Sequence, residues 1–314
     1  MKKTAFIFPG QGSQSVGMGK DLYDNFAVAK QIFDTADRVL GRSISKICFE
    51  GPEEDLKLTV NTQPAIVTTS IAILEVFKES VKISPDYVAG HSLGEYCAMY
   101  AAGVMSLENT FMAIQKRAEL MSQTKGGSMA AILNAPEEVL QAGLKIGSEA
   151  GYVDVANYNS PVQVVITGDE NAVKAAGDYM LANGARRVVP LPVSGAFHSK
   201  YMKGAGEKFA EFVSGLELNN AKIPVITNVD ASETQILDDF RKKMPEQIYS
   251  SVHWTQTIQK MAENGVDTFI EIGPGKVLAG LNKKILAEAS VYNIYDIASL
   301  EETVSSIKQA LLGV

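Results

Sequence analysis

The feature that most constrains the fold is a short strand, a glycine-flanked serine and a helix that follow one another directly. The apolar run at 87–89 has the character of a buried strand end, and it leads into GHSLG at 90–94, which fits the pattern G-x-S-x-G. The next segment, 95–103, is rich in Ala, Met and Tyr and is predicted to be helical. This order is the setting of a nucleophile elbow, so the sequence predicts an α/β fold in which the Ser92 hydroxyl stands clear of a sheet.

G-x-S-x-G also occurs by chance, so an alternative interpretation has to be considered. In that interpretation Ser92 only caps a helix between two turn glycines. The flanking strand and helix favour the nucleophile. In that role, the helix N-terminus offers free N–H groups, led by that of Leu93, to a negative charge that develops on a substrate oxygen. The N–H of Gln11, just after a predicted first strand at 4–8, is the second donor that we expect.

Composition excludes several classes of protein. The chain has 314 residues, 46% hydrophobic and 21% charged, which is enough for one large domain or two unequal ones. A net charge of −7 disfavours a nucleic-acid partner. Cys48 and Cys97 are the only cysteines and form no C-x-x-C pair, which argues against a disulfide scaffold or a zinc site and suits a reducing cytoplasm.

Neither terminus nor interior suggests a membrane segment. The apolar run near the start is too short for a signal peptide and stops at Pro9-Gly10, and no stretch is apolar for long enough to span a bilayer. We therefore expect a cytoplasmic protein that does not bind membranes.

Two glycine-rich loops resemble nucleotide-binding motifs but fail on spacing. After Gly10 and Gly12 the next glycine is Gly17, so G-x-G-x-x-G is absent. The segment GPGK at 273–276 lacks the Walker spacing and is followed by valine. The first loop is expected to line a site instead.

After residue 125 the pattern of helices and strands changes, and this pattern predicts a separate domain. We expect strands and helices alternating as β-α-β-β-α-β, the order of a ferredoxin-like unit, with a turn at 157–161. The predicted strands are 128–133, 152–156, 163–167 and 185–190, and the helices are 136–150 and 169–183. The predicted domains are therefore 126–195, inserted, and a larger α/β domain made of 1–125 and 196–314.

The same patterns predict the main elements of the larger domain. Helices are expected at 21–40, 61–80, 107–123, 200–215 and 301–312, the last with Leu311 inward, and within 240–261, broken at Pro245. Strands are expected at 4–8, 223–229 and 266–272.

A serine nucleophile needs a base, and the chain has only three histidines. His91 neighbours Ser92, and because neighbours on a tight turn point apart, it is expected to pack or bond locally. His198, in a glycine-containing loop before a predicted helix, ranks first, and His253 ranks second. No carboxylate is obviously placed to orient the imidazole, and a backbone carbonyl could do so instead.

Taken together, the motifs resemble the malonyl-CoA:acyl carrier protein transacylase family of bacterial fatty acid synthesis over essentially the whole chain. The likeness rests on FPGQGSQ at 8–14, TQPAI at 62–66, AGHSLGEY at 89–96, KRAELM at 116–121, GSMAAIL at 127–133, NYNSP at 157–161, PLPVSGAFHS at 190–199 and IGPGKVLAGL at 272–281.

The resemblance implies an α/β-hydrolase-like large domain with a parallel sheet, plus the ferredoxin-like insert. It implies that Ser92 is acylated by malonyl-CoA, that His198 is the base, and that Gln11 and Leu93 supply the oxyanion hole. Arg117, which helical position alone would assign to a solvated face, becomes the residue that binds the malonyl carboxylate. A planar guanidinium can hold a carboxylate by two parallel hydrogen bonds.

Three further residues receive expected roles from the resemblance. Asn159, in the NYNSP segment, would line the cleft between the domains, and His91 would belong to the same surroundings. The family commonly has glutamine just before the Trp-Thr pair, where this chain has His253. A backbone carbonyl there orients the catalytic imidazole in the family, so His253 is expected to keep that role.

The expected reaction moves malonyl from malonyl-CoA to the phosphopantetheine thiol of acyl carrier protein through a malonyl-serine intermediate, with no metal or redox cofactor. We expect a monomer. Four lysines could contact an acidic carrier protein, although such residues are more often simply solvated: Lys200, Lys203, Lys283 and Lys284.

Other functions stay open at this point. They are a discrete acyltransferase of polyketide synthesis, a serine thioesterase or esterase on the same scaffold, and a carrier-protein or CoA-binding module that has lost activity.

Overall fold

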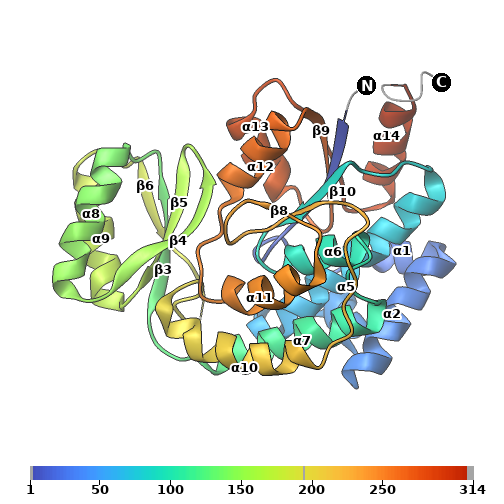
Figure 1. Ribbon diagram of the computed structural model, residues 1–314, viewed down its shortest axis with the longest axis horizontal. Helices are drawn as coiled ribbons and strands as arrows, with labels where there is room; N and C mark the ends of the chain where they lie inside the picture. Colours follow the sequence, from blue (N-terminus) through green and yellow to red (C-terminus); the bar gives the residue numbers. More distant parts are fainter. Residues whose placement is uncertain (1–2, 194, 310–314) are drawn as a thin grey trace.

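The computed structural model describes residues 3–193 and 195–309, and in these ranges two sheets organise the chain (Figure 1). The larger sheet has the strand order β10-β9-β1-β2-β7-β8. Its neighbours pair in parallel, except for the antiparallel pair β7 and β8. The strands are β1 (Lys3–Phe8), β2 (Tyr87–Gly90), β7 (Val225–Ile226), β8 (Glu233–Thr234), β9 (Val266–Ile272) and β10 (Ser290–Ile294).

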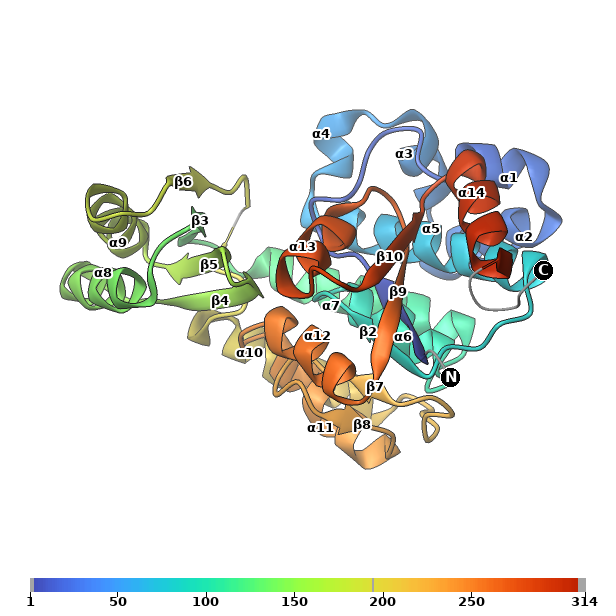
Figure 2. The ribbon, with the colours of Figure 1, turned by 90° about the horizontal axis from the view of Figure 1, so that it is seen from above.

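Helices cover both faces of this sheet (Figure 2). They are α1 (Lys20–Asn25), α2 (Ala27–Leu40), α3 (Ile44–Glu50), α4 (Glu53–Leu56), α5 (Thr59–Ser80), α6 (Gly94–Ala101), α7 (Leu107–Gln123), α10 (Lys203–Ser214), α11 (Leu237–Gln247), α12 (Trp254–Glu263), α13 (Val277–Ile285) and α14 (Ile297–Ile307), with a 3₁₀ turn at Lys200–Met202. None of the helices within the described ranges has the length and apolar character needed to cross a bilayer.

The core explains the continuous apolar run in the central strand β1. In β1, Phe6 and Phe8 pack into the core that contains α5, whereas Ala5 and Ile7 pack into a second core under α12 and α13. A parallel strand that is covered on both faces needs apolar residues at every position. This arrangement buries the sheet and leaves the loops at its carboxyl ends to form a site.

The smaller sheet is antiparallel with the order β4-β5-β3-β6, and it forms the lobe at the left of Figure 1. Its strands are β3 (Ser128–Leu133), β4 (Val153–Ser160), β5 (Gln163–Gly168) and β6 (Arg187–Pro190), and its helices are α8 (Glu137–Ala150) and α9 (Glu170–Ala182). The chain order is the expected β-α-β-β-α-β, so the predicted fold class is confirmed. An isolated bridge between Gly126 and Gly195 supports the proposed domain boundaries, which stay a prediction.

A segment of the large domain attaches to the outer strand of the small sheet. The Val252 N–H donates to the Ala156 carbonyl at 2.8 Å, and the Tyr158 N–H donates to the Val252 carbonyl at 2.9 Å. The Thr255 hydroxyl also donates to the Tyr158 carbonyl at 3.0 Å. These bonds extend the small sheet by the segment that leads into α12.

This attachment overturns the predicted turn at 157–161. Residues 157–160 belong to β4, because their backbone pairs with β5 on one side and with Val252 on the other. The turn is shorter than predicted and lies between β4 and β5.

Other boundaries also differ from the prediction. The strand expected at 223–229 contains only β7, two residues long. Pro245 lies within the last turn of α11 and does not break it, since only one late helical hydrogen bond is lost there. The C-terminal helix begins at Ile297, behind an Asp296–Ser299 capping box, and the expected end at Leu312 and the inward Leu311 lie outside the described residues.

Candidate active site

Ser92 lies on a strained turn between β2 and α6. Its φ is 52°, in the left-handed region that non-glycine residues seldom adopt. The flanking glycines are required by close approach: a Cβ on Gly90 would lie 1.9 Å from the Gly94 carbonyl carbon, and one on Gly94 would lie 2.3 Å from the Phe8 oxygen. The turn therefore packs against β1 and lifts the serine side chain away from the sheet.

Two side chains from distant segments meet the Ser92 hydroxyl. His198 Nε2 lies 2.8 Å from Ser92 Oγ, and Arg117 Nη2 donates to the same oxygen at 3.0 Å. Because the guanidinium can only donate, the hydroxyl proton is left to bond His198 Nε2. The serine is thus already paired with an acceptor that can remove its proton.

His198 is held in the tautomer that this contact needs. Its Nδ1 lies 3.0 Å from the carbonyl oxygens of both Gln247 and Ser250, so the proton resides on Nδ1 and Nε2 is free to accept. Burial lowers the His198 pKa to about 3, with further lowering from the nearby charges of Arg117 and His91. The imidazole is therefore neutral, as a general base must be.

The expectation that His253 orients the imidazole is wrong. Its carbonyl accepts the Thr257 N–H at 2.9 Å, and so serves the first turn of α12. Its ring stacks on Tyr158 with centroids 5.2 Å apart and planes at 11°. The orienting carbonyls come instead from the end of α11 and the loop after it.

Arg117 is buried, with 1% of its surface exposed, so the solvated-face interpretation is also wrong. Its Nη1 donates to Gln63 Oε1 at 2.7 Å, and its Nη2 donates to Gln247 Oε1 at 3.0 Å. Its guanidinium carbon lies 5.6 Å from the centre of the Tyr96 ring. Burial lowers the Arg117 pKa, and none of the ion pairs found within the described ranges includes this residue. A buried guanidinium held by neutral amides favours an anionic ligand.

A cavity opens in front of the serine and brings most of the predicted site together. It is lined by Gln11, Gln63, His91, Ser92, Leu93, Arg117, Met121, Met129, Asn157, Leu191, Val193, Phe197 and His198. In the described part of the chain, the backbone N–H groups of Gln11 and Leu93 donate to no other protein group, which leaves them free for a ligand oxygen. The Ser92 N–H, in contrast, donates to Asn228 Oδ1 at 2.7 Å.

Asn159 does not line this cavity, contrary to expectation. Its Oδ1 lies 2.8 Å from His91 Nε2, and the His91 ring itself lines the cavity. Asn159 therefore supports the wall from behind, and Asn157 of the same strand reaches the cavity. The expectation that His91 packs or bonds locally is wrong, because its hydrogen-bond partner Asn159 lies 68 residues away, in β4 of the small sheet. As expected, His91 is not the base: it makes no hydrogen bond to the Ser92 hydroxyl.

Sequence reasoning missed several residues of the site, among them Gln63, Asn228 and Gln247. Gln63 carried only a weak signal, since Asn61 and Thr62 beside it are polar and buried as well. Asn228 and Gln247 carried none, because their roles come from loops and helix ends that meet only in the folded chain.

The chain is similar to known acyl transferases over nearly its full length. The family described as acyl transferase domain matches residues 5–305. Malonyl CoA-acyl carrier protein transacylase of Bacillus subtilis (strain 168) is 46% identical over 313 residues, covering 98% of each chain. The protein of the same name from Synechocystis is 43% identical, covering 93% of this chain and 97% of the relative.

Solved structures give the same likeness in three dimensions. One chain in a solved complex of a type II PKS acyl-carrier protein with its malonyl-transacylase matches with a TM-score of 0.94 and 39% identity, over 97% of this chain and 100% of that one. An acyl carrier protein S-malonyltransferase from Vibrio cholerae matches with a TM-score of 0.92 and 40% identity, over 96% of this chain and 100% of that one.

Proposed function

The chain belongs to the acyl transferase domain family, and on that premise we infer that it is a serine acyltransferase that moves malonyl from malonyl-CoA to acyl carrier protein. The observation that carries this inference is the buried Arg117, whose Nη2 lies 3.0 Å from the Ser92 hydroxyl. The placement sets an anion-binding group next to a nucleophile. It suits an acyl donor whose far end is a carboxylate.

In the first step, Ser92 Oγ attacks the thioester carbonyl of malonyl-CoA, and its proton passes to His198 Nε2. The carbonyl oxygen becomes an oxyanion, which the N–H groups of Gln11 and Leu93 stabilise. When the tetrahedral intermediate collapses, the C–S bond breaks, and the CoA sulfur takes the proton from His198. The products are malonyl-Ser92 and free CoA.

The second step is the reverse chemistry with a different thiol. The phosphopantetheine thiol of the carrier protein gives its proton to His198 and attacks the malonyl-Ser92 ester. The same N–H groups stabilise the second oxyanion, and Ser92 regains its proton as it leaves. Because serine and histidine supply the nucleophile and the base, the mechanism we propose uses no metal or redox cofactor.

Arg117 supplies the specificity in this account. Its guanidinium can bind the malonyl carboxylate through two parallel hydrogen bonds in a site shielded from water. Acetyl offers no such acceptor and leaves the buried charge without an anionic partner, which costs binding energy. Gln63 and Gln247 hold the guanidinium in position for that contact.

The proposed function extends to the pathway, the location and the oligomeric state of the protein. The pathway is fatty acid synthesis, with polyketide synthesis as the second candidate, because a structural neighbour is a transacylase bound to a type II PKS carrier. We propose a cytoplasmic location, supported by two buried cysteines that remain free thiols. We also propose a monomer, which sedimentation would show as the mass of a single chain.

The test is transfer to purified carrier protein. Wild-type enzyme with malonyl-CoA should add one malonyl group to the phosphopantetheinylated carrier, seen by intact mass, and Ser92→Ala should add none. Rapid release of free malonate without transfer would instead identify a thioesterase. Side-by-side kcat/KM values for fatty acid and polyketide carriers would decide the pathway.

A further inference from the structure

Glu95, three residues after the serine, is a buried carboxylate that the proposed mechanism does not use. It is 1% exposed on α6, and its Oε2 accepts the Asn228 N–H at 2.6 Å. Burial raises its pKa to about 7, against the opposing effect of the Asn228 N–H. A buried acid that bonds one loop amide beside a nucleophile needs a reason, because burying it is costly.

Asn228 supplies that reason through its own side chain. It lies just after β7 and is wholly buried. Its Oδ1 accepts the Ser92 N–H at 2.7 Å, and its Nδ2 donates to the Gly90 carbonyl at 2.8 Å. The two bonds bracket the left-handed turn, and only a side chain with a donor and an acceptor in one plane can make both.

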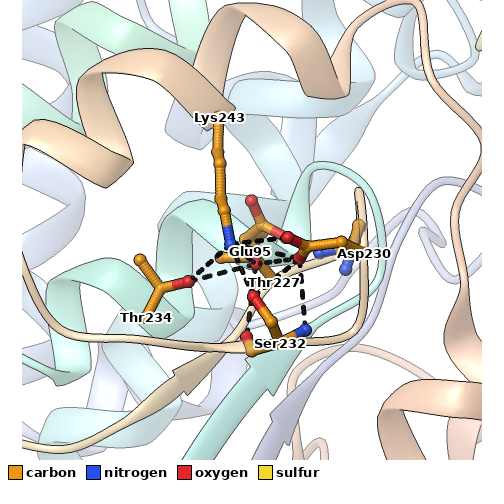
Figure 3. A network of polar contacts seen from close by, with 7 residues as sticks. Glu95, Thr227, Asp230, Ser232, Thr234 and Lys243 are labelled. Atoms are coloured by element: carbon orange, nitrogen blue, oxygen red, sulfur yellow. Dashed lines mark hydrogen bonds and ion pairs between the residues drawn. The ribbon is translucent and has the colours of Figure 1, made fainter.

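The loop that carries Asn228 is itself tied down, as Figure 3 shows. Lys243 Nζ lies 2.9 Å from Asp230 Oδ2 and donates to the hydroxyls of Thr227 at 3.1 Å and Thr234 at 3.0 Å. Lys243 also donates to the Ser232 hydroxyl at 2.6 Å. Since Lys243 stands one turn before Gln247 on α11, one helix fixes this loop, the guanidinium and the imidazole relative to one another.

We propose that Asn228 is a positioning residue that holds Ser92 in its strained conformation for acyl transfer, and that Glu95 and Lys243 hold Asn228 in place. The inference rests on the proposed function. The bond from the Ser92 N–H to Asn228 also has a chemical consequence. Because this N–H is already used, the oxyanion of the tetrahedral intermediate must be stabilised by the N–H groups of Leu93 and Gln11.

We call the two side-chain bonds of Asn228, to the Ser92 N–H and the Gly90 carbonyl, the clamp. The variant Asn228→Asp tests it, because the state of the new carboxyl group changes with pH. Ionised, the new carboxylate still accepts from the Ser92 N–H, but it repels the Gly90 carbonyl and adds a negative charge beside Glu95. Protonated, it is a close copy of asparagine with one donor and one acceptor. Several charged or titratable groups surround it. Glu95 on α6 accepts its N–H, and the charges of Lys243 on α11 and Arg117 on α7 act on Glu95. Asp230 pairs with Lys243, the His253 N–H donates to the Asn228 carbonyl, His91 lies between the two residues that Asn228 bonds, and His198 contacts Ser92.

The expected result is a split between rate and affinity. At pH 8, acylation of Ser92 by malonyl-CoA should be slower by about 100-fold, the scale of a small misplacement of a reacting group, while KM changes less than about threefold. Relative to wild type, the rate should recover at least about tenfold as the pH falls from 8 to 5.5, because the aspartate gains its proton. A loss of equal size at every pH would overturn the proposal.

A matched control separates positioning from general destabilisation. Asn282 is also wholly buried, and its side chain accepts one hydrogen bond, from Trp254 Nε1 at 3.1 Å. Asn282→Ala should lower the melting temperature without any recovery of rate at low pH.

If Asn228→Asp fails to fold, a second variant tests the same proposal. Lys243→Met, which loosens the loop from a partly exposed position, should slow acylation by about threefold to tenfold at unchanged KM.

A fluorophosphonate probe keeps this test independent of the acyl donor. It reports the reactivity of Ser92 by mass, whatever the natural substrate. Wild-type labelling without malonyl transfer would refute the proposed function alone. Labelling of Asn228→Asp at the wild-type rate at pH 8 would refute the clamp alone.

Discussion

His198 sits where its proton affinity is set by burial, not by a carboxylate partner. Two backbone carbonyls accept from Nδ1, and the Arg117 guanidinium shares the Ser92 hydroxyl with Nε2. Both the low polarity and the nearby positive charge disfavour a second proton on the ring. The base is therefore neutral across the whole pH range in which the protein would work.

The first prediction follows from the His198 pKa of about 3. The rate of Ser92 acylation should change less than about twofold between pH 8 and pH 5. A histidine at its ordinary pKa of about 6.5 would lose about 30-fold over the same range, because most of it would be protonated. Stopped-flow CoA release gives the profile. Because Glu95 also titrates, with a pKa of about 7, an inflection near pH 6.5 that persists in Glu95→Gln would contradict the account.

The same shift affects stability in a direction that can be worked out. Because the folded pKa of His198 is depressed, its contribution to stability is present above the unfolded value of about 6.5 and is lost as the pH falls toward 3. In His198→Ala, the free energy of unfolding should fall less between pH 6.5 and 4 than in wild type. Denaturant titrations of both proteins at the two pH values provide the comparison.

The third prediction concerns Arg117. Arg117→Ala should reduce kcat/KM for malonyl-CoA by about 100-fold to 1,000-fold, the scale of losing a buried charge-assisted pair. Acetyl-CoA should lose far less, since it never contacts the guanidinium through a carboxylate. The ratio of the two values is the readout, and an equal loss for both donors would mean that Arg117 serves only to hold Ser92.

At the scale of single residues, the sequence predicted the site residues whose roles depend on their neighbours in the chain. GHSLG pointed to Ser92 because the elbow is built from adjacent residues. His198 emerged because the chain has so few histidines. Arg117 was misjudged from helical position, because its burial depends on Gln63 in α5 and Gln247 in α11, which are distant in sequence.

At the scale of elements, the GPGK segment acquires an explanation. It precedes α13, whose first N–H groups would attract a phosphate in a nucleotide-binding protein. Here Glu271 of β9 occupies that position, since its carboxylate accepts the N–H groups of Leu278 at 3.0 Å and Ala279 at 2.8 Å. The carboxyl group of Glu271 already occupies the helix terminus, which agrees with the failed Walker spacing.

The fourth prediction concerns this internal cap. Burial raises the Glu271 pKa to about 7, so its contribution to stability is full below the unfolded value of about 4.5 and is lost as the pH rises through 7. Between pH 5 and 8, wild type should lose about 1–3 kcal/mol more unfolding free energy than Glu271→Gln. Denaturant titration measures this difference, and parallel pH dependence in the two proteins would contradict it.

Elements were predictable where their own residues carry the pattern. The apolar runs of β1 and β9 and the amphipathic α7 appear at or near their predicted positions. β10, missed by the sequence reasoning, is an edge strand whose residues are mostly half-buried, so it lacks a strong apolar signal. The polar end of β4 was missed because one of its two partners is a loop about a hundred residues away.

At the scale of the whole molecule, the two sheets are joined through the site. The segment with Ser250, whose carbonyl orients His198, continues into Val252, which pairs with β4 of the small sheet. Movement of the small lobe would therefore disturb the base. This link could not be predicted from sequence, since no pattern in either segment indicates that the two segments pair. The order of helices and strands along the chain, in contrast, was enough to predict the fold class.

The fifth prediction tests that link. The amides of Val252 and Tyr158, which bond across the two lobes, should exchange hydrogen as slowly as the paired amides inside β3. Hydrogen exchange read by mass spectrometry or NMR resolves this. Fast exchange at the two bridging amides, with β3 protected, would show that the lobes separate in solution.

The central claim is that Ser92 carries a malonyl group between two thiols, and intact-protein mass after mixing with malonyl-CoA tests it most directly. No carrier protein is added, so the acyl-enzyme has no acceptor except water and the CoA that it has released, and excess malonyl-CoA opposes the return to CoA. The account predicts one added malonyl mass on wild type and none on Ser92→Ala. Malonyl mass that persists on Ser92→Ala, or free malonate with no acyl-enzyme on wild type, would contradict it.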